Sequence, residues 1–158
     1  MAFPVSKQGS PGFDKEMTSG KKHRLGTRME FPDGRVFYYG KSGEAITAGK
    51  VAMMKTPNAD HIKDLAVASA ASVGDKQLTI TNGKYTGDFT TEGDLVDGYL
   101  FVNDEAGEGQ VFQIHDHSTA ATGAAITVDL YPNDSVRTAL TTSSEVGIAT
   151  SIYRAAEV

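Results

Sequence analysis

Hydrophobic and polar residues alternate along much of the chain, and the clearest alternation predicts a β-hairpin. Two strand-like runs, Leu95–Val102 and Gln110–His115, flank the turn-rich segment Asn103–Gly109. Because successive side chains of a strand point to opposite faces, Phe112 and Ile114 should share one face. The spacing predicts a hairpin with a loop longer than two residues, and we expect this hairpin to form the centre of a β domain.

The two strands of this hairpin differ in the faces they present. On the first strand both faces are apolar, with Leu100 and Val102 on one and Tyr99 and Phe101 on the other. Such a strand is typical of burial on two sides. On the second strand, alternation places three polar residues opposite the apolar pair, namely Gln113, His115 and His117.

Further runs predict strands elsewhere in the chain. A hairpin is expected around Pro32-Asp33-Gly34, because proline fixes φ, Asp bonds the nearby backbone and Gly takes positive φ. Its strands are Thr27–Phe31 and Arg35–Tyr39. The other strands expected are Ala45–Met54, Gln77–Thr81 (Leu78 and Ile80 inward), Ala125–Tyr131 (Ile126, Val128 and Leu130 on one face) and Glu145–Thr150.

At most one short helix is expected. Thr56-Pro57 could open it, with Thr as N-cap and Pro at the first helical position. Asn58–Ala71 then places Ile62 and Leu65 at helical spacing, and a single extended segment is the alternative. Short strands 8–12 residues apart favour a small β-sandwich or β-barrel, so the chain is predicted to be mainly β.

The first 24 residues differ from the rest of the chain. They contain glycine, proline and serine without a helical or alternating pattern, and they predict an extended N-terminal arm before a β-rich domain over 25–158. The arm carries five basic and two acidic residues, a balance of +3, while the whole 158-residue chain is −5. A basic arm before an acidic body indicates a segment that lies on another surface. The residues expected to contact another surface or a neighbouring subunit are Phe3, Val5, Lys7, Phe13, Lys21, Lys22 and Arg24.

Composition excludes several classes of protein. The chain is 39% hydrophobic and 22% charged, which is typical of a globular protein, and it has no cysteine for disulfides or thiolate metal sites. No apolar run approaches the ~20 residues of a membrane span, so we expect no membrane partner and an intracellular site of synthesis. The run Lys21–Arg24 has no interleaved aromatics, and the acidic body argues against nucleic acid as a partner.

One histidine pattern suggests an enzyme. Gly109 to His117 reads G-x5-H-x-H, which resembles the first half of the cupin metal motif, and imidazole suits divalent metals. The glutamate that the motif needs is replaced by Ala121 or Thr122, and no histidine follows His117. The alternative is a pair of surface or interface histidines, His115 and His117, at a strand end.

No complete catalytic or cofactor site appears in the sequence. Asp104, Glu105 and Glu108 share a loop, but their spacing matches no EF-hand pattern. Gly40-Lys41-Ser42 lacks the glycine-rich loop of a P-loop. We therefore expect neither enzymatic activity nor a cofactor.

Two regions carry a resemblance to a known family. The first is Leu25–Arg28 with Pro32–Tyr39 and Ala48–Lys50, and the second is Gly98–Leu100 with Gly107–Gln110, Ile114, Thr127–Leu130 and Tyr153. Together they resemble the small capsid decoration (cement) proteins of tailed bacteriophages. The resemblance spans about residues 25–154 and consists of turn and strand patterns.

The resemblance implies a virion protein on the outer surface of an icosahedral head. It would stabilise contacts between capsomers, with the major capsid protein and its own copies as partners, as a trimer at three-fold or quasi-three-fold positions. No catalytic residue comes with the family. The alternatives are another virion component, such as a tail or head fibre, and a cupin-like enzyme that uses His115 and His117.

Overall fold

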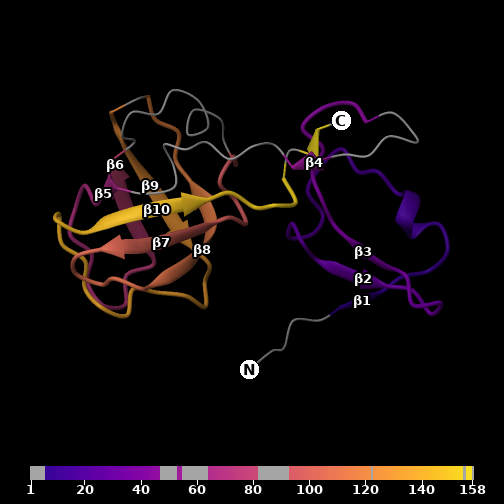
Figure 1. Cartoon of the computed structure of the whole chain (residues 1–158), viewed down its shortest axis with the longest axis horizontal. Coiled ribbons are helices and arrows are strands. Elements are labelled where there is room, and N and C mark those ends of the chain that lie inside the picture. The colour runs from indigo at the N-terminus through magenta and orange to yellow at the C-terminus, as the bar shows by residue number, and fades with distance from the viewer. Residues whose placement is uncertain are drawn as a thin grey trace. The chain divides into compact units, whose positions relative to one another are not determined.

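The chain divides into two compact units (Figure 1). The computed structural model describes residues 6–46, 53–54, 64–81, 93–121, 123–154 and 156–157. The hairpin unit comprises Met1–Lys55 and Ile152–Val158, and the barrel unit comprises Thr56–Ser151. The boundary predicted after residue 24 lies inside the hairpin unit, and the assignment of residues 1–24 as an arm stays a prediction.

The barrel unit is a single antiparallel sheet that curls until its edges meet. Val67 bridges Ile80, and the Ala68 N–H donates to the Thr79 carbonyl at 2.8 Å, so the first and last strands of the sheet are joined. The strand order is β5-β10-β7-β8-β9-β6. The strands are β5 Leu65–Ala66, β6 Gln77–Thr81, β7 Tyr99–Asp104, β8 Val111–His117, β9 Ala125–Leu130 and β10 Glu145–Ala149. The prediction of a mainly β fold with a small barrel is confirmed.

Alternation of apolar residues fills the inside of the barrel. Leu78 and Ile80 of β6 are buried, as the sequence predicts, and so are alternate residues of the other long strands. Every strand contributes to one continuous cluster because a curled sheet has a single inner face. Its members include Leu65, Val67, Leu78, Ile80, Leu100, Val102, Phe112, Ile114, Ile126, Val128, Leu130, Val146 and Ile148.

The expected two-sided burial of β7 is wrong. Leu100 and Val102 face the core, whereas Tyr99 is 47% exposed and Phe101 is partly exposed. The outer face of β7 turns outwards because a strand within a closed sheet has only one face toward the core.

The expectation that His115 and His117 share a face is also wrong. The pairing of β8 with β9 runs Ile114↔Leu130 and then Asp116↔Asp129, so a bulge lies between Ile114 and Asp116. The extra residue reverses the alternation after the bulge. His115 and Asp116 are both exposed, and His117 is buried.

The helix expected over Asn58–Ala71 is wrong where the structure describes it. β5 pairs with β10, and Ala71 bridges Leu140, so this segment is extended. Leu65 and Val67 are buried with Ala66 exposed between them, a period of two that tertiary pairing enforces over the helical propensity of alanine. Residues 56–63, which include Ile62, lie outside the described residues.

The hairpin unit contains a three-stranded sheet in the order β1-β2-β3. The predicted hairpin is confirmed as β2 Arg28–Glu30 and β3 Val36–Tyr38, and β1 Lys7–Gln8 adds a parallel strand beside β2. A 3-10 helix, η1, covers Phe13–Lys15. β4 Met53–Met54 pairs with β11 Ala156–Glu157; of the strand expected over Ala45–Met54, residues 47–52 lie outside the described residues.

Candidate partner-binding surface

The N-terminal segment packs directly on β2. The Gly9 N–H donates to the Glu30 carbonyl at 2.8 Å, and Gly9 is buried. A Cβ at this position would lie 2.9 Å from both Met29 Cγ and Phe31 Cε2. A larger residue at position 9 would force Met29 or Phe31 to shift, so glycine allows β1 to approach β2 this closely.

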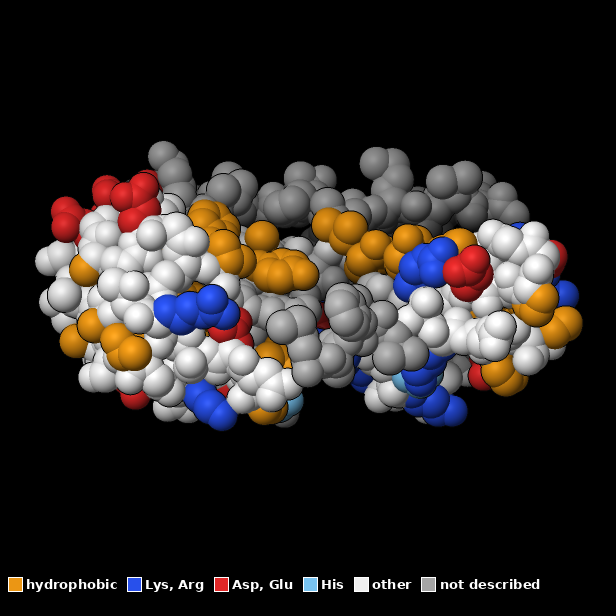
Figure 2. Space-filling view, turned by 90° about the horizontal axis from the view of Figure 1, so that it is seen from below, with side chains coloured by type: hydrophobic (Ala, Val, Ile, Leu, Met, Phe, Trp, Pro, Cys, Tyr) orange, Lys and Arg blue, Asp and Glu red, His pale blue; other side chains and the backbone are white. Residues whose placement is uncertain are grey.

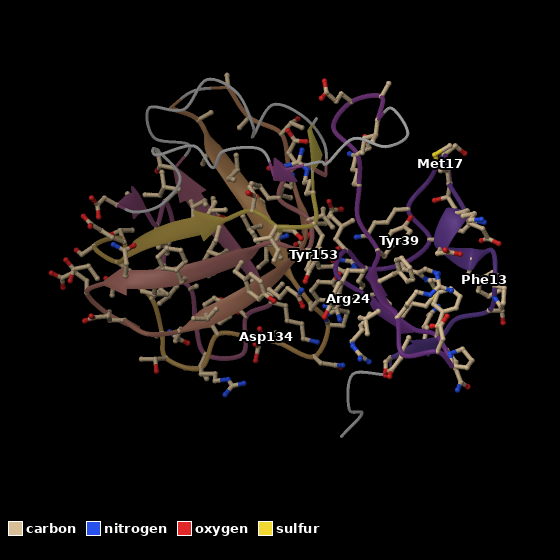
Figure 3. All side chains as sticks on the ribbon, turned by 45° about the vertical axis from the view of Figure 1, so that its right-hand side comes forward. Phe13, Met17, Arg24, Tyr39, Asp134 and Tyr153 are labelled. Carbon is tan, nitrogen blue, oxygen red and sulfur yellow. The ribbon has the colours of Figure 1, made fainter. Side chains whose placement is uncertain are left out.

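Tyr39 fixes the basic run Lys21–Arg24 on the sheet (Figure 3). The Lys22 N–H donates to the Tyr39 hydroxyl at 3.1 Å, and the Thr18 hydroxyl lies 3.1 Å from the same oxygen. The His23 ring packs edge-on against the Tyr39 ring, with 5.4 Å between centroids. One phenol thus holds a loop that has no strand or helix of its own.

The Lys7 ammonium joins the same cluster. Lys7 Nζ lies 3.0 Å from His23 Nδ1, which links β1 to the basic run. Figure 2 shows the resulting group of blue side chains around a histidine on the hairpin unit. We call this surface the basic patch, and define it as Lys7, Lys21, Lys22, His23 and Arg24.

The electrostatic field of the basic patch acts on Tyr39. Hydrogen bonding with Thr18 and from the Lys22 backbone N–H, together with the charges of Lys22 and Lys21, lowers the pKa of Tyr39 below its usual value. Each of these favours the phenolate. An anion placed against this surface would meet the same positive charges.

The hairpin unit has little hydrophobic core of its own. Among its described residues, Phe31 is the one large hydrophobic side chain that is fully buried. Arg35 covers it, with its guanidinium carbon 4.9 Å from the Phe31 ring centroid. Large apolar side chains are instead exposed on the hairpin unit, namely Phe13, Met17, Val36, Tyr38, Ile46 and Ile152. These side chains give the unit apolar surface for a partner to cover.

The structure separates the residues predicted to make contacts. It brings Lys7 to His23, and it holds the Lys22 backbone and the His23 ring on Tyr39. The charge of Lys21 also acts on Tyr39, and Arg24 follows His23 directly in the chain. Phe13 lies apart in η1, where it is 50% exposed at the outer rim of the hairpin unit in Figure 3. Phe3 and Val5 lie outside the described residues.

Two residues that position the basic patch were not identified from the sequence. Gly9 and Tyr39 act through contacts between residues 17 to 22 positions apart, which no local pattern reveals. The one available signal was the aromatic pair at the end of the predicted second strand of the hairpin.

His117 has a structural part in the barrel unit. Its Nε2 accepts a hydrogen bond from the Leu95 N–H at 3.1 Å, and its Nδ1 lies 2.9 Å from the Ser118 carbonyl oxygen, to which it donates. Both ring nitrogens are used, which defines a neutral tautomer with no free lone pair for a metal. His115 packs edge-on against Tyr131 at 5.0 Å between ring centroids. The two imidazoles do not converge, and no group of three or more potential metal ligands occurs among the described residues.

The loop after β7 gathers acidic side chains at one end of the barrel unit. Asp104 and Glu145 are cross-strand partners, and the Asn103 side-chain amide donates to Asp64 Oδ1 at 3.2 Å. Figure 2 shows acidic side chains grouped on this unit. We call this surface the acidic end, and define it as Asp64, Asp104, Glu105, Glu108 and Glu145.

A hollow on the barrel unit lies beside β6. It is lined by small and polar residues, and three of its polar side chains already have structural partners. Asp75 accepts from the Ser72 N–H, Lys76 donates to the Pro132 carbonyl and Gln77 donates to Asp129. The Gln77 bond ties β6 to β9, and the other two bonds hold the segment before β6. The lining therefore supports no catalytic assignment.

The two units have opposite net charges. The hairpin unit contains eleven Lys and Arg against six Asp and Glu, a net charge of +5. The barrel unit contains four Lys and Arg against fourteen Asp and Glu, a net charge of −10. The charge asymmetry of the sequence therefore follows the division into compact units.

Comparison with protein-family models, curated proteins and solved structures finds no match to this chain. Within the part of the chain that the structure describes, no helix has the length and apolar character needed to cross a membrane.

Proposed function

We propose that this chain is a capsid decoration protein that binds the outer surface of a tailed-bacteriophage head and stabilises contacts between capsomers. Its partners are the major capsid protein and further copies of itself, arranged as a trimer at three-fold or quasi-three-fold positions. The turn and strand patterns that resemble the decoration family support this proposal.

The observation that carries the proposal is the unequal packing of the two units. The barrel unit has a complete core, whereas the hairpin unit buries one large hydrophobic side chain among its described residues and exposes six. A small unit that cannot bury its apolar surface alone is stabilised when a partner covers that surface. This is the arrangement expected of a protein that works by adhering to a larger assembly.

Stabilisation of the head would follow from mass action. A ligand that binds the assembled lattice and not its separate subunits favours the lattice by RT ln(1 + [L]/Kd). Three linked copies on one three-fold position would add avidity, since the second and third contacts become intramolecular. Modest contacts from each hairpin unit are then sufficient.

Localisation on the particle is the primary test. Phage particles encoded by the same genome would be purified and examined by mass spectrometry and cryo-electron microscopy. We expect the chain in stoichiometric amounts, as density on the outside of the head at three-fold positions. Density on the tail or on fibres would instead establish another virion role, and absence from particles would overturn both.

A binding assay tests which surface adheres. Heads lacking the chain would be mixed with wild-type protein, with a Phe13→Ser/Met17→Ser variant, and with a Val73→Ser variant as the control from the barrel unit, where Val73 is 66% exposed. Co-sedimentation should fall at least fivefold for the first variant and stay unchanged for the control. Equal binding by all three proteins would contradict the assignment of the hairpin unit as the adhesive surface.

A further inference from the structure

We infer that the basic patch of one copy binds the acidic end of the barrel unit of a second copy, so that subunits join head to tail. The inference deepens the proposed function and rests on it for the biological setting. It specifies the two surfaces and the partner, and it is tested without capsids.

The basic patch concentrates basic groups at a defined position. Lys22 and His23 are held on Tyr39, and Lys7 Nζ lies 3.0 Å from His23 Nδ1. Cations gathered on one surface repel each other in the free subunit, and an anionic partner offsets that repulsion with attraction. The pKa of Tyr39 is lowered mainly by the hydrogen bond with Thr18, and the charges of Lys22 and Lys21 add a smaller effect in the same direction.

The acidic end concentrates the opposite charge in the same way. Asp104 and Glu145 face each other across β7 and β10, where like charges are destabilising. Glu105 adopts a positive φ of 64°, and with Glu108 it extends the acidic surface into the loop. The barrel unit has four Lys and Arg for its fourteen carboxylates, so the unit as a whole attracts an external cation.

The partner in this inference is a second copy, because each copy carries the complement to both surfaces. Complementary patches steer association and fix register. Because the two patches differ, the contact is heterologous, and such contacts close into rings when the rotation permits. A ring of three would match the trimer in the proposed function. Nucleic acid is disfavoured as the occupant, since the −10 barrel unit repels phosphate.

Charge reversal on each side tests the contact. The variants are Lys21→Glu/Lys22→Glu in the basic patch, Glu105→Lys/Glu108→Lys at the acidic end, and the two pairs combined. The matched control is Lys15→Glu/Lys41→Glu, two exposed lysines of the hairpin unit outside the patch. Sedimentation velocity would measure native mass at about 0.02 M and 1 M salt, where the Debye length falls from roughly 20 Å to 3 Å. Circular dichroism would verify folding.

We expect wild-type protein to associate at low salt and to dissociate at high salt. Each single reversal should weaken association at least tenfold, and a mixture of the two reversed proteins should associate again. The combined variant should associate with itself, because a self-contact then pairs opposite charges. The control should behave as wild type.

Several outcomes would overturn the inference. They are a monomeric wild type at low salt, unchanged mass in both single reversals, or failure of the folded combined variant to associate. Binding of a DNA duplex by the wild type, lost in Lys21→Glu/Lys22→Glu without any effect on mass, would assign the patch to nucleic acid instead. If the chain is found on phage heads but the charge reversals leave its native mass unchanged, the proposed function stands and this contact is refuted.

Discussion

Single side chains in this protein contact segments that are distant in the sequence. Gln110, just before β8, illustrates this in the barrel unit: its amide oxygen accepts from the Arg137 and Thr138 N–H groups at 2.8 and 3.0 Å. Its amide nitrogen donates to the Thr138 and Gly107 carbonyls at 2.9 and 3.1 Å. One side chain thereby satisfies the backbone of a segment that has no strand of its own, where unpaired groups would be costly.

His117 offers the sharpest prediction at this scale. His117→Ala removes the acceptor of the buried Leu95 N–H, which should destabilise the barrel unit by about 1–3 kcal/mol. Chemical denaturation would measure the loss. His115→Ala, at an exposed position of the same strand, should change stability by less than about 0.5 kcal/mol. Equal effects of the two substitutions would refute the structural part assigned to His117.

The elements of the hairpin unit depend on close approach between short segments. β1 has two residues, and its place beside β2 requires the missing Cβ of Gly9. Lys7 at the end of the same strand then reaches His23. The position of the basic patch is therefore set by strand pairing rather than by local propensity.

Gly9→Ala should displace β1 from β2. The added methyl would meet Met29 and Phe31 at 2.9 Å, and overpacking of this kind costs about 1–3 kcal/mol. Hydrogen exchange should show faster exchange of the Gly9 and Gln8 amides and of their neighbours in β2. Gly20→Ala is the matched control, because a Cβ added there would have no neighbour within 4 Å, and it should leave exchange unchanged.

The pKa of Tyr39 makes the loop–strand contact measurable by titration. Because the folded state lowers this pKa, phenolate formation should occur at a lower pH than for an ordinary tyrosine. The stability that the hairpin unit gains from this shift is fully present above the pKa of Tyr39 in the unfolded chain. It is lost as the pH falls through the lower pKa of Tyr39 in the folded state. Ultraviolet titration against a Tyr39→Phe reference would isolate the group. Lys21→Glu/Lys22→Glu should raise the pKa of Tyr39, because two positive charges that lower it are replaced by negative ones. A Tyr39 pKa in the wild type equal to that of an ordinary tyrosine would contradict the contact.

At the scale of the whole chain, the two units should differ in stability. Among the described residues, the barrel unit contributes seventeen to the core cluster, whereas Phe31 of the hairpin unit stands outside that cluster. Stability follows buried apolar area, so the hairpin unit should open with a smaller free energy than the barrel unit.

Calorimetry of the full chain should therefore resolve two transitions, the earlier one from the hairpin unit. Ile80→Ala, within the barrel core, should lower the later transition selectively, since such truncations cost about 2–5 kcal/mol. Phe31→Ala should lower the earlier one. A single transition shifted equally by both substitutions would show that the units unfold together.

The pattern of apolar and turn residues was enough to predict the β class, the two hairpins and the inner faces of β6 and β9. Each of these follows from alternation and turn chemistry within about 15 residues, as the buried Leu78, Ile80, Ile126 and Val128 show. The charge asymmetry was likewise visible, although its division at the unit boundary was not.

Tertiary structure alone decided which residues meet. A bulge in β8 turned His117 inward, strand pairing made 64–71 extended, and Tyr39 gathered the basic run on the sheet. The physical reason is the same in each case. Burial and hydrogen bonds across the whole fold determine a one-residue shift of strand register or a contact between residues 17 positions apart. Local propensity is too weak to oppose them.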